Sequence, residues 1–103
     1  MLETIEHVHP RRLSAVETTV FRCCRPRRVI VTTPNKEYNA LYGMPDHVLR
    51  HPDHYFEWTR SRFRAWARGI AERNGYRVEF REIGEADFDL GAPTQMATWE
   101  RPE

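Results

Sequence analysis

The chain has 103 residues and a formal net charge of +1 at pH 7, which indicates one small domain or part of one. Because 15 of its 16 basic residues are arginine and the charges nearly balance, an anionic partner would have to bind a local patch. No apolar run is long enough for a signal peptide or a membrane span, so we expect a soluble protein of the cytoplasm with no membrane partner.

The first predicted element is a helix from about Arg11 to Cys23, since Pro10 suits a first helical turn. Its apolar stripe consists of residues at helical spacing: Leu13, Val16, Val20 and Cys24. Cys23 and Cys24 are adjacent, which excludes a disulfide framework and a zinc knuckle. Both are therefore expected to be reduced thiols on this helix.

The β-branched run RVIVTT at residues 28–33 predicts a strand of the kind buried in a parallel sheet. A long stretch without helical or strand periodicity follows, from Pro34 to Trp58. Connections of this length are usually functional or disordered. The stretch keeps many aromatic and aliphatic side chains, which argues against disorder and predicts a functional loop.

A second helix is predicted after Thr59 or Ser61, either of which can cap it, and Gly75 supplies its C-terminal stop. Its apolar stripe follows the helical period: Phe63, Trp66, Ala67, Ile70 and Ala71. Alternating apolar and charged residues at 76–83 predict a half-exposed strand, and residues 94–100 predict another after an acidic loop. Because no helix separates these two strands, we expect antiparallel neighbours in an α/β fold.

Two short stretches carry chemistry. Glu3, Glu6 and His7 form an E-x-x-E-H motif, which on one helical turn points two carboxylates and an imidazole the same way. This is half of a site for Mn²⁺ or Mg²⁺, and a histidine from a distant loop could complete it. By spacing alone, a solvated chain end explains the motif as well. The second stretch, RHPDHYFEWTR at 50–60, crowds two histidines, two acids and aromatic residues together.

The order of these motifs resembles the HUA ENHANCER family of small-RNA 3′-terminal ribose 2′-O-methyltransferases. E-x-x-E-H is followed by a strand ending in TTPN, by HPDHYFEWTR, by an Arg-rich helix containing F-x-x-W-A, and by a TQMA strand. The resemblance covers essentially all 103 residues. It implies the C-terminal half of a class I, Rossmann-like S-adenosylmethionine-dependent methyltransferase. This half has about three strands and two main helices, and its last strand is inserted antiparallel between the other two.

The resemblance also implies how the domain is divided. A class I methyltransferase holds S-adenosylmethionine with a Gly-rich turn and an acidic residue, both upstream of E-x-x-E-H. Only two residues precede Glu3 here. Residues 1–103 are therefore expected to form a single partial domain that carries the metal and RNA-end residues. Its cofactor-binding residues are unknown, and the chain alone is expected to be inactive.

The resemblance implies a metal site made of Glu3, Glu6, His7 and His54, which would bind one Mn²⁺ or Mg²⁺. The substrate would be a small RNA whose terminal 2′- and 3′-hydroxyls are free and bind this ion. Coordination would make the 2′-hydroxyl more acidic, so that its oxygen attacks the methyl group of S-adenosylmethionine. His7 and His51 are candidate proton acceptors, although a solvated loop residue is the stronger interpretation of His51.

Five residues are expected near the RNA: Asn35, Trp58, Arg60, Arg64 and Gln95. Trp58 could stack on the terminal base, and Arg60 and Arg64 could follow the phosphate backbone. A loop anchored to the core by Phe56 and a solvated basic helix face are the alternative interpretations.

Two other functions stay open at this stage. The chain could be a non-catalytic module that binds metal and RNA 3′ ends. It could also be one subunit of a split methyltransferase, whose missing N-terminal half would dock on an exposed apolar sheet edge beside RVIVTT.

Overall fold

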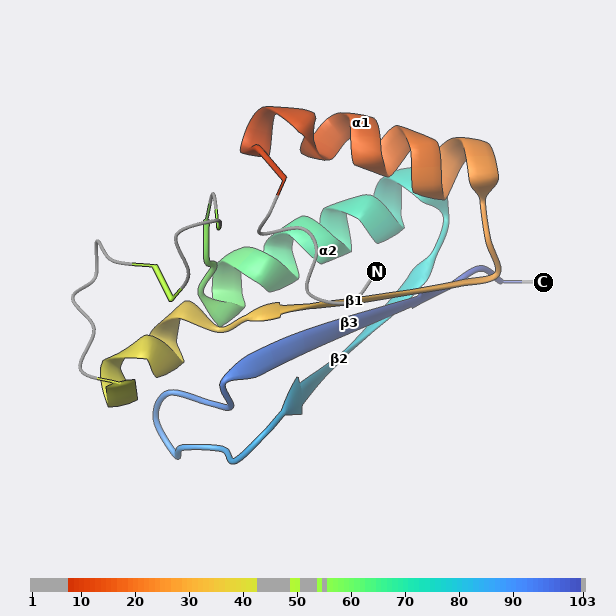
Figure 1. The fold of residues 1–103 in the computed structure, drawn as a ribbon. Helices are drawn as coiled ribbons and strands as arrows, with labels where there is room; N and C mark the ends of the chain where they lie inside the picture. Colours follow the sequence, from red (N-terminus) through yellow and green to blue (C-terminus); the bar gives the residue numbers. More distant parts are fainter. Residues whose placement is uncertain (1–7, 43–48, 51–53, 55, 103) are drawn as a thin grey trace.

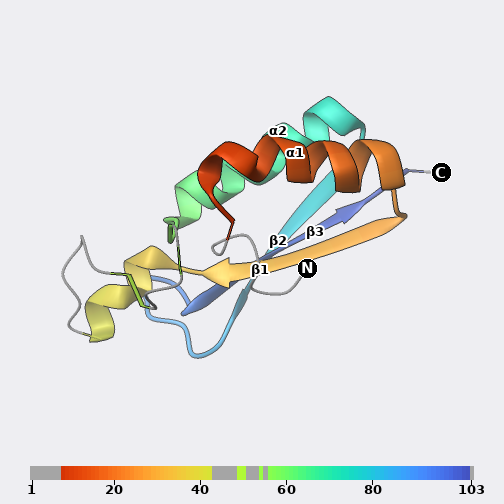
Figure 2. The same ribbon diagram turned by 45° about the horizontal axis from the view of Figure 1, so that its top comes forward.

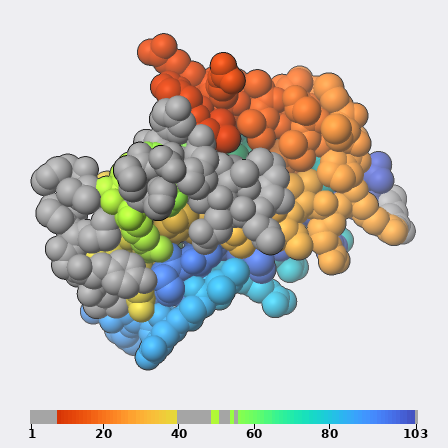
Figure 3. Space-filling view, viewed as in Figure 1, coloured from red at the N-terminus to blue at the C-terminus, as the bar shows by residue number. Residues whose placement is uncertain are grey.

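The computed structural model describes residues 8–42, 49–50, 54 and 56–102. This part of the chain forms two layers, in which a helical segment at 10–24 and α2 (Arg60–Asn74) lie side by side on one face of a sheet (Figures 1 and 2). In the space-filling view, the segment at 10–24 covers one side of the molecule and the residues around β2 (Arg77–Ile83) line the opposite side (Figure 3). The predicted α/β arrangement is therefore confirmed.

The sheet has the order β1-β3-β2, formed by β1 (Arg28–Pro34), β2 (Arg77–Ile83) and β3 (Thr94–Glu100). Both pairings are antiparallel, which confirms the expected place of the last strand between the other two. The parallel environment expected for the first strand is not found among the described residues, where β1 pairs only with β3. A run of β-branched residues indicates that a strand is buried. Burial alone does not show whether the neighbouring strand is parallel or antiparallel.

The split-enzyme alternative required an exposed apolar edge beside β1, and the described residues do not show one. Their exposed large apolar side chains are Ile83 and Phe88, neither of which belongs to β1. Val29 and Val31 are buried in the core, and Thr33 is fully buried as well.

The first helical segment changes its winding twice. It begins with a 3-10 turn at Pro10–Arg12, continues as α1 (Leu13–Glu17) and ends as a π-helix at Thr18–Cys24. The predicted apolar stripe is wrong at its end, because Phe21 is buried and Cys24 is exposed. Phe21 lies on the inner face within the π-helix, where its ring meets those of Tyr76 and Trp99. Both cysteines are free thiols on this segment, as expected.

The second helix agrees closely with its prediction. Thr59 is the N-cap, since its hydroxyl accepts the Arg62 backbone N–H at 3.3 Å, and Gly75 ends the helix with a positive φ of 71°. The stripe residues face the sheet, with Phe63 and Ile70 almost completely buried. The prediction is accurate because the capping residues and the apolar period indicate the same helix.

The core is centred on Trp99 of β3, whose side chain has no exposed surface. Its indole N–H donates to the Ala67 carbonyl of α2 at 3.0 Å. The rings of Phe21 and Trp66 meet it edge to face, at centroid distances of 5.1 and 5.9 Å. One residue of the middle strand therefore joins the sheet to both helical segments.

The long connection after β1 is partly ordered into a helix that the sequence pattern did not predict. A 3-10 helix covers Lys36–Tyr42. It begins where the Asn35 side-chain oxygen accepts the Glu37 backbone N–H at 3.0 Å, a local turn that needs no apolar period. No helix in the described part of the chain is both long and apolar enough to cross a membrane.

Glu17 links the two helical segments. Its carboxylate accepts two hydrogen bonds from Arg73, at 2.9 and 3.0 Å, and one from the Asn74 side chain at 2.9 Å. The hydrogen bond from Arg73 holds the pKa of Glu17 below its usual value. The resulting stabilisation is therefore present above the pKa of the unfolded chain and is lost as the pH falls through the folded pKa.

We expect Glu17→Gln to lower the free energy of unfolding by about 1 kcal/mol at neutral pH, a modest value because Arg73 is solvent-exposed. The difference from the parent chain should shrink as the pH falls through the lowered pKa of Glu17, where the carboxylate of the parent becomes protonated. Urea denaturation followed by circular dichroism measures both quantities, and Glu79→Gln, at an exposed position on β2, is the control. A difference that stays constant down to acidic pH would contradict the role of the charge.

Candidate metal and RNA-end site

A buried carboxylate organises the loop beyond the Pro34 end of β1. The Glu57 side chain has no exposed surface. Its Oε1 accepts the Asn39 side-chain N–H at 2.8 Å, and its Oε2 accepts the Arg50 backbone N–H at 2.7 Å. The same Oε2 lies 2.6 Å from His54 Nδ1. These four residues, Asn39, Arg50, His54 and Glu57, are called the Glu57 cluster below.

His54 is held in one orientation by this cluster. Its side chain is 9% exposed, and its Nδ1 faces the Glu57 carboxylate. A carboxylate accepts a hydrogen bond and cannot donate one when ionised, so the proton of a neutral ring lies on Nδ1. A metal ion bound by His54 would therefore be bound through Nε2.

The remaining predicted ligands, Glu3, Glu6 and His7, lie outside the described residues, as does the candidate base His51. Among the residues that the structure describes, no three His, Cys, Asp or Glu side chains form a group that could hold a metal ion. The four-residue ligand set thus stays a prediction, of which the structure describes only His54.

Arg50 connects the cluster to the end of the sheet. Its Nη2 donates to the Asn35 carbonyl at 2.6 Å, and its Nε donates to the Asn39 side-chain oxygen. The places of Asn39 and Arg50 in this cluster, and the burial of Glu57, were not predicted from the sequence. The available signal was a glutamate between two aromatic residues, three positions after His54. Nothing in the sequence pattern distinguished Asn39 or Arg50.

Asn35 is fully buried and joins three segments. Its side-chain NH₂ donates to the Leu90 and Ala92 carbonyls at 2.8 and 2.9 Å, and its backbone pairs with that of Trp58. These contacts give Asn35 a structural role at the site wall. The RNA contact expected for it stays a prediction.

Gln95 is also buried, with 3% of its surface exposed. Its side-chain NH₂ donates to the Trp58 carbonyl at 2.9 Å and to the Pro34 carbonyl at 3.2 Å. Within the described part of the chain, its Oε1 is a buried acceptor without a hydrogen-bond partner. Buried acceptors usually have a partner, so this atom calls for a functional explanation.

Trp58 is half-buried in a line of aromatic rings. Phe56 stacks on it at a centroid distance of 4.4 Å, and Trp66 lies 5.3 Å away on the core side. The Arg62 guanidinium lies 5.1 Å from the centre of the Trp58 ring. Phe56 is buried in the core cluster, as the anchoring interpretation expects. Base stacking by Trp58 stays a prediction.

Arg60 and Arg64 line a shallow hollow of about 360 Å³ along α2. Arg60 is tied to Glu37 through Nε at 2.9 Å and to the Asp89 carbonyl through Nη2 at 2.8 Å. The hydrogen bond from Arg60 lowers the pKa of Glu37. Arg64 lies over the Phe80 ring at 5.5 Å. The two arginines therefore have packing partners, and their contact with phosphates stays a prediction.

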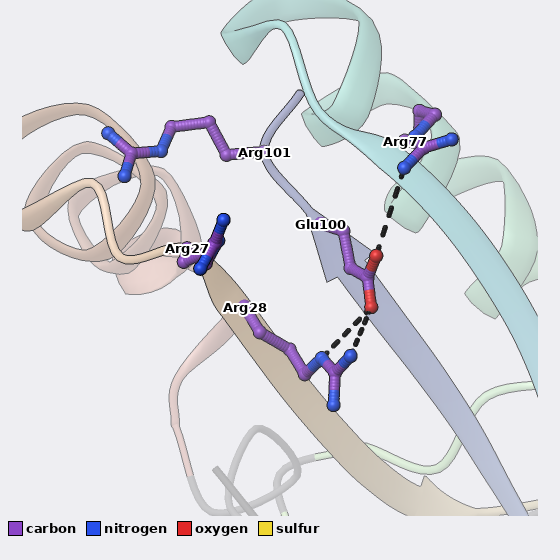
Figure 4. A pocket seen from close by; sticks show the side chains of 5 residues that line it. All are labelled: Arg27, Arg28, Arg77, Glu100 and Arg101. Atoms are coloured by element: carbon purple, nitrogen blue, oxygen red, sulfur yellow. Dashed lines mark hydrogen bonds and ion pairs between the residues drawn. The ribbon is translucent and has the colours of Figure 1, made fainter. Parts of the chain in front are cut away.

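A larger hollow, of about 630 Å³, lies at the other end of the sheet (Figure 4). Its lining consists of Arg27, Arg28, Arg77, Glu100 and Arg101. Arg28 donates to Glu100 through Nε at 3.0 Å, and Arg77 lies 3.8 Å from the same carboxylate. In the strand register, Arg28 and Glu100 lie at one end of β1 and Pro34 lies at the other. This hollow is therefore separate from the Glu57 cluster.

Comparisons with known proteins place the chain among methyltransferases. The small RNA 2′-O-methyltransferase of Gallus gallus is 40% identical over 102 residues, which are 95% of this chain and 27% of that protein. The crystal structure of the methyltransferase domain of bacterial CtHen1-C superposes with a TM-score of 0.85 at 50% identity, covering 100% of this chain and 51% of that one. The crystal structure of small RNA methyltransferase HEN1 gives 0.90 at 35% identity, covering 99% and 13%.

No protein-family model matches the chain. The chain spans about a quarter of the length of the curated relatives that it matches. The superpositions confirm the predicted fold class, a partial Rossmann-like methyltransferase.

Proposed function

Because the chain belongs to the family of small RNA 2′-O-methyltransferases, we propose that it carries the metal and RNA-end part of a domain that methylates the 3′-terminal ribose of small RNA. S-adenosylmethionine is the methyl donor in this proposal. When bound, it would supply an electrophilic methyl group for the 2′-oxygen, and His7 or His51 would accept the hydroxyl proton.

The observation that carries the metal dependence is the pair formed by His54 and Glu57. Histidines that bind metal ions usually donate their other ring N–H to a carboxylate or carbonyl. Nδ1 of His54 has such a partner at 2.6 Å, so the described donor fits a metal ligand. Glu3, Glu6 and His7 would complete the ligand set, and the bound ion would make the 2′-hydroxyl more acidic.

The RNA end is proposed to lie between the Glu57 cluster and α2. Gln95 supports this position through its side-chain NH₂, which holds the Trp58 and Pro34 carbonyls together at this end of the sheet. Trp58 would then contact the terminal base, with Asn35 holding the wall behind it. Arg60 and Arg64 border the hollow along α2 and would lie beside the phosphates.

A second candidate function is a module that binds metal and RNA ends and does not itself methylate. Such a module could act alone, or it could be one part of a split methyltransferase. The observation in its favour is the pair formed by His54 and Glu57, because a histidine held by a carboxylate fits metal binding with or without methyl transfer. In the split methyltransferase, an N-terminal half on another polypeptide would supply the S-adenosylmethionine site.

The proposal predicts Mn²⁺-dependent binding of a short RNA with free 2′- and 3′-hydroxyls, and much weaker binding of the same RNA with a 2′-deoxy end. The measurement pairs a binding titration with transfer of a labelled methyl group from S-adenosylmethionine. Transfer that requires the 2′-hydroxyl supports the enzyme, and end-dependent binding without transfer supports the second candidate. Equal binding of both RNAs, unaffected by a chelator, would contradict both.

A further inference from the structure

The Glu57 carboxylate is an unusual group to bury in so small a domain. Removing a carboxylate from water is costly unless hydrogen bonds or a cation compensate. The described contacts of Glu57 come from the Asn39 side chain, the Arg50 backbone N–H and the His54 ring. The Arg50 guanidinium donates hydrogen bonds to the Asn39 side-chain oxygen and to the Asn35 carbonyl.

We propose that Glu57 is a positioning residue, which fixes the ring orientation and the tautomer of His54 so that Nε2 can bind the metal ion. This inference rests on the proposed function and extends it to residues outside the ligand set. A carboxylate on the second nitrogen of a histidine orients the ring and raises its basicity as a ligand. The 2.6 Å contact supplies this arrangement.

The carboxylate is itself held in place on both oxygens. Asn39 donates to Oε1, and the Arg50 backbone N–H donates to Oε2. Arg50 Nε donates to the Asn39 side-chain oxygen, which sets the amide so that its NH₂ faces Glu57. A chain of hydrogen bonds thus runs from the Asn35 carbonyl at the end of the sheet, through Arg50 and Asn39, to Glu57 and His54. The sheet determines where the His54 ring lies.

Glutamine cannot replace Glu57 without loss. The carboxylate accepts from three groups, with both oxygens in use. The NH₂ of a glutamine would face either the Asn39 NH₂, or the Arg50 N–H and the His54 ring. In Glu57→Gln the side chain keeps its size, but at least one donor loses its acceptor.

The test measures the tautomer and the metal affinity separately, on the intact chain. NMR of the imidazole nitrogens in the metal-free protein should show the proton of neutral His54 on Nδ1. Glu57→Ala removes the acceptor of Nδ1, whereas a glutamine could keep its oxygen on His54 by turning its NH₂ toward Asn39. Glu57→Ala should shift this population toward Nε2, and it should raise the dissociation constant for Mn²⁺, measured by electron paramagnetic resonance, by about 10- to 100-fold. Asn39→Ala, which removes one support of the carboxylate, should have the same effects to a smaller degree. Glu85→Gln, in the exposed loop after β2, is the matched control.

An unchanged tautomer in a folded Glu57→Ala chain would overturn the positioning role, and so would a dissociation constant within about twofold of the parent value, well below the expected range. If the parent chain binds no Mn²⁺, the proposed metal function fails. The tautomer in the metal-free protein then still decides whether Glu57 positions His54. Circular dichroism of each variant shows whether it is folded, and Asn39→Ala replaces Glu57→Ala if the latter is not.

Discussion

Replacing His54 by alanine is expected to weaken Mn²⁺ binding by more than about 100-fold, beyond the range typical of residues that only support a ligand. The imidazole is the one described member of the proposed ligand set, and it comes from a segment distant in sequence from Glu3, Glu6 and His7. Its removal leaves the Glu57 carboxylate with two of its three hydrogen-bond partners. We expect methyl transfer by any complete form of the domain to be lost together with metal binding.

The measurement is a titration of Mn²⁺ followed by electron paramagnetic resonance of the free ion. His9→Ala is the control, since His9 is an exposed histidine that accepts the Arg11 backbone N–H at the start of the first helical segment. Unchanged Mn²⁺ affinity in a folded His54→Ala chain would exclude His54 from the metal site. An equal loss in His9→Ala would point to non-specific binding by surface imidazoles.

Trp99→Ala should destabilise the fold by about 3–5 kcal/mol, which is the usual cost of removing a fully buried tryptophan. The change removes the edge-to-face contacts with Phe21 and Trp66 and leaves a cavity between the sheet and both helical segments. Small domains have a free energy of unfolding of only about 5–15 kcal/mol. The variant should therefore be largely or partly unfolded at modest temperature.

Urea denaturation followed by circular dichroism measures this loss. Trp99→Phe is the intermediate variant, because it keeps a ring in the core but removes the hydrogen bond to the Ala67 carbonyl. The control is Phe88→Ala, since Phe88 is completely exposed and should change the stability by less than about 0.5 kcal/mol. A similar loss in Trp99→Ala and Phe88→Ala would contradict the assignment of the core.

The sequence by itself determined the elements whose signals are local. α2 was predicted with its N-cap Thr59, its apolar stripe and its stop at Gly75, because capping, helical period and glycine conformation depend on neighbouring residues. The strands β2 and β3 followed from alternation and from the loop between them. The motif order also identified the family, since short motifs keep their residue types and their order along the chain.

Only the tertiary structure decided how distant residues meet. The π-helical winding turned Phe21 into the core in place of Cys24, an outcome that depends on packing against Trp99 and Tyr76. Asn35 and Gln95 proved to be buried and hydrogen-bonded to backbone carbonyls of other segments. The Glu57 cluster combines residues from separate parts of one long connection, and no period links them. Such sites arise because a buried polar group must find partners wherever the fold brings them, and sequence spacing carries no record of that requirement.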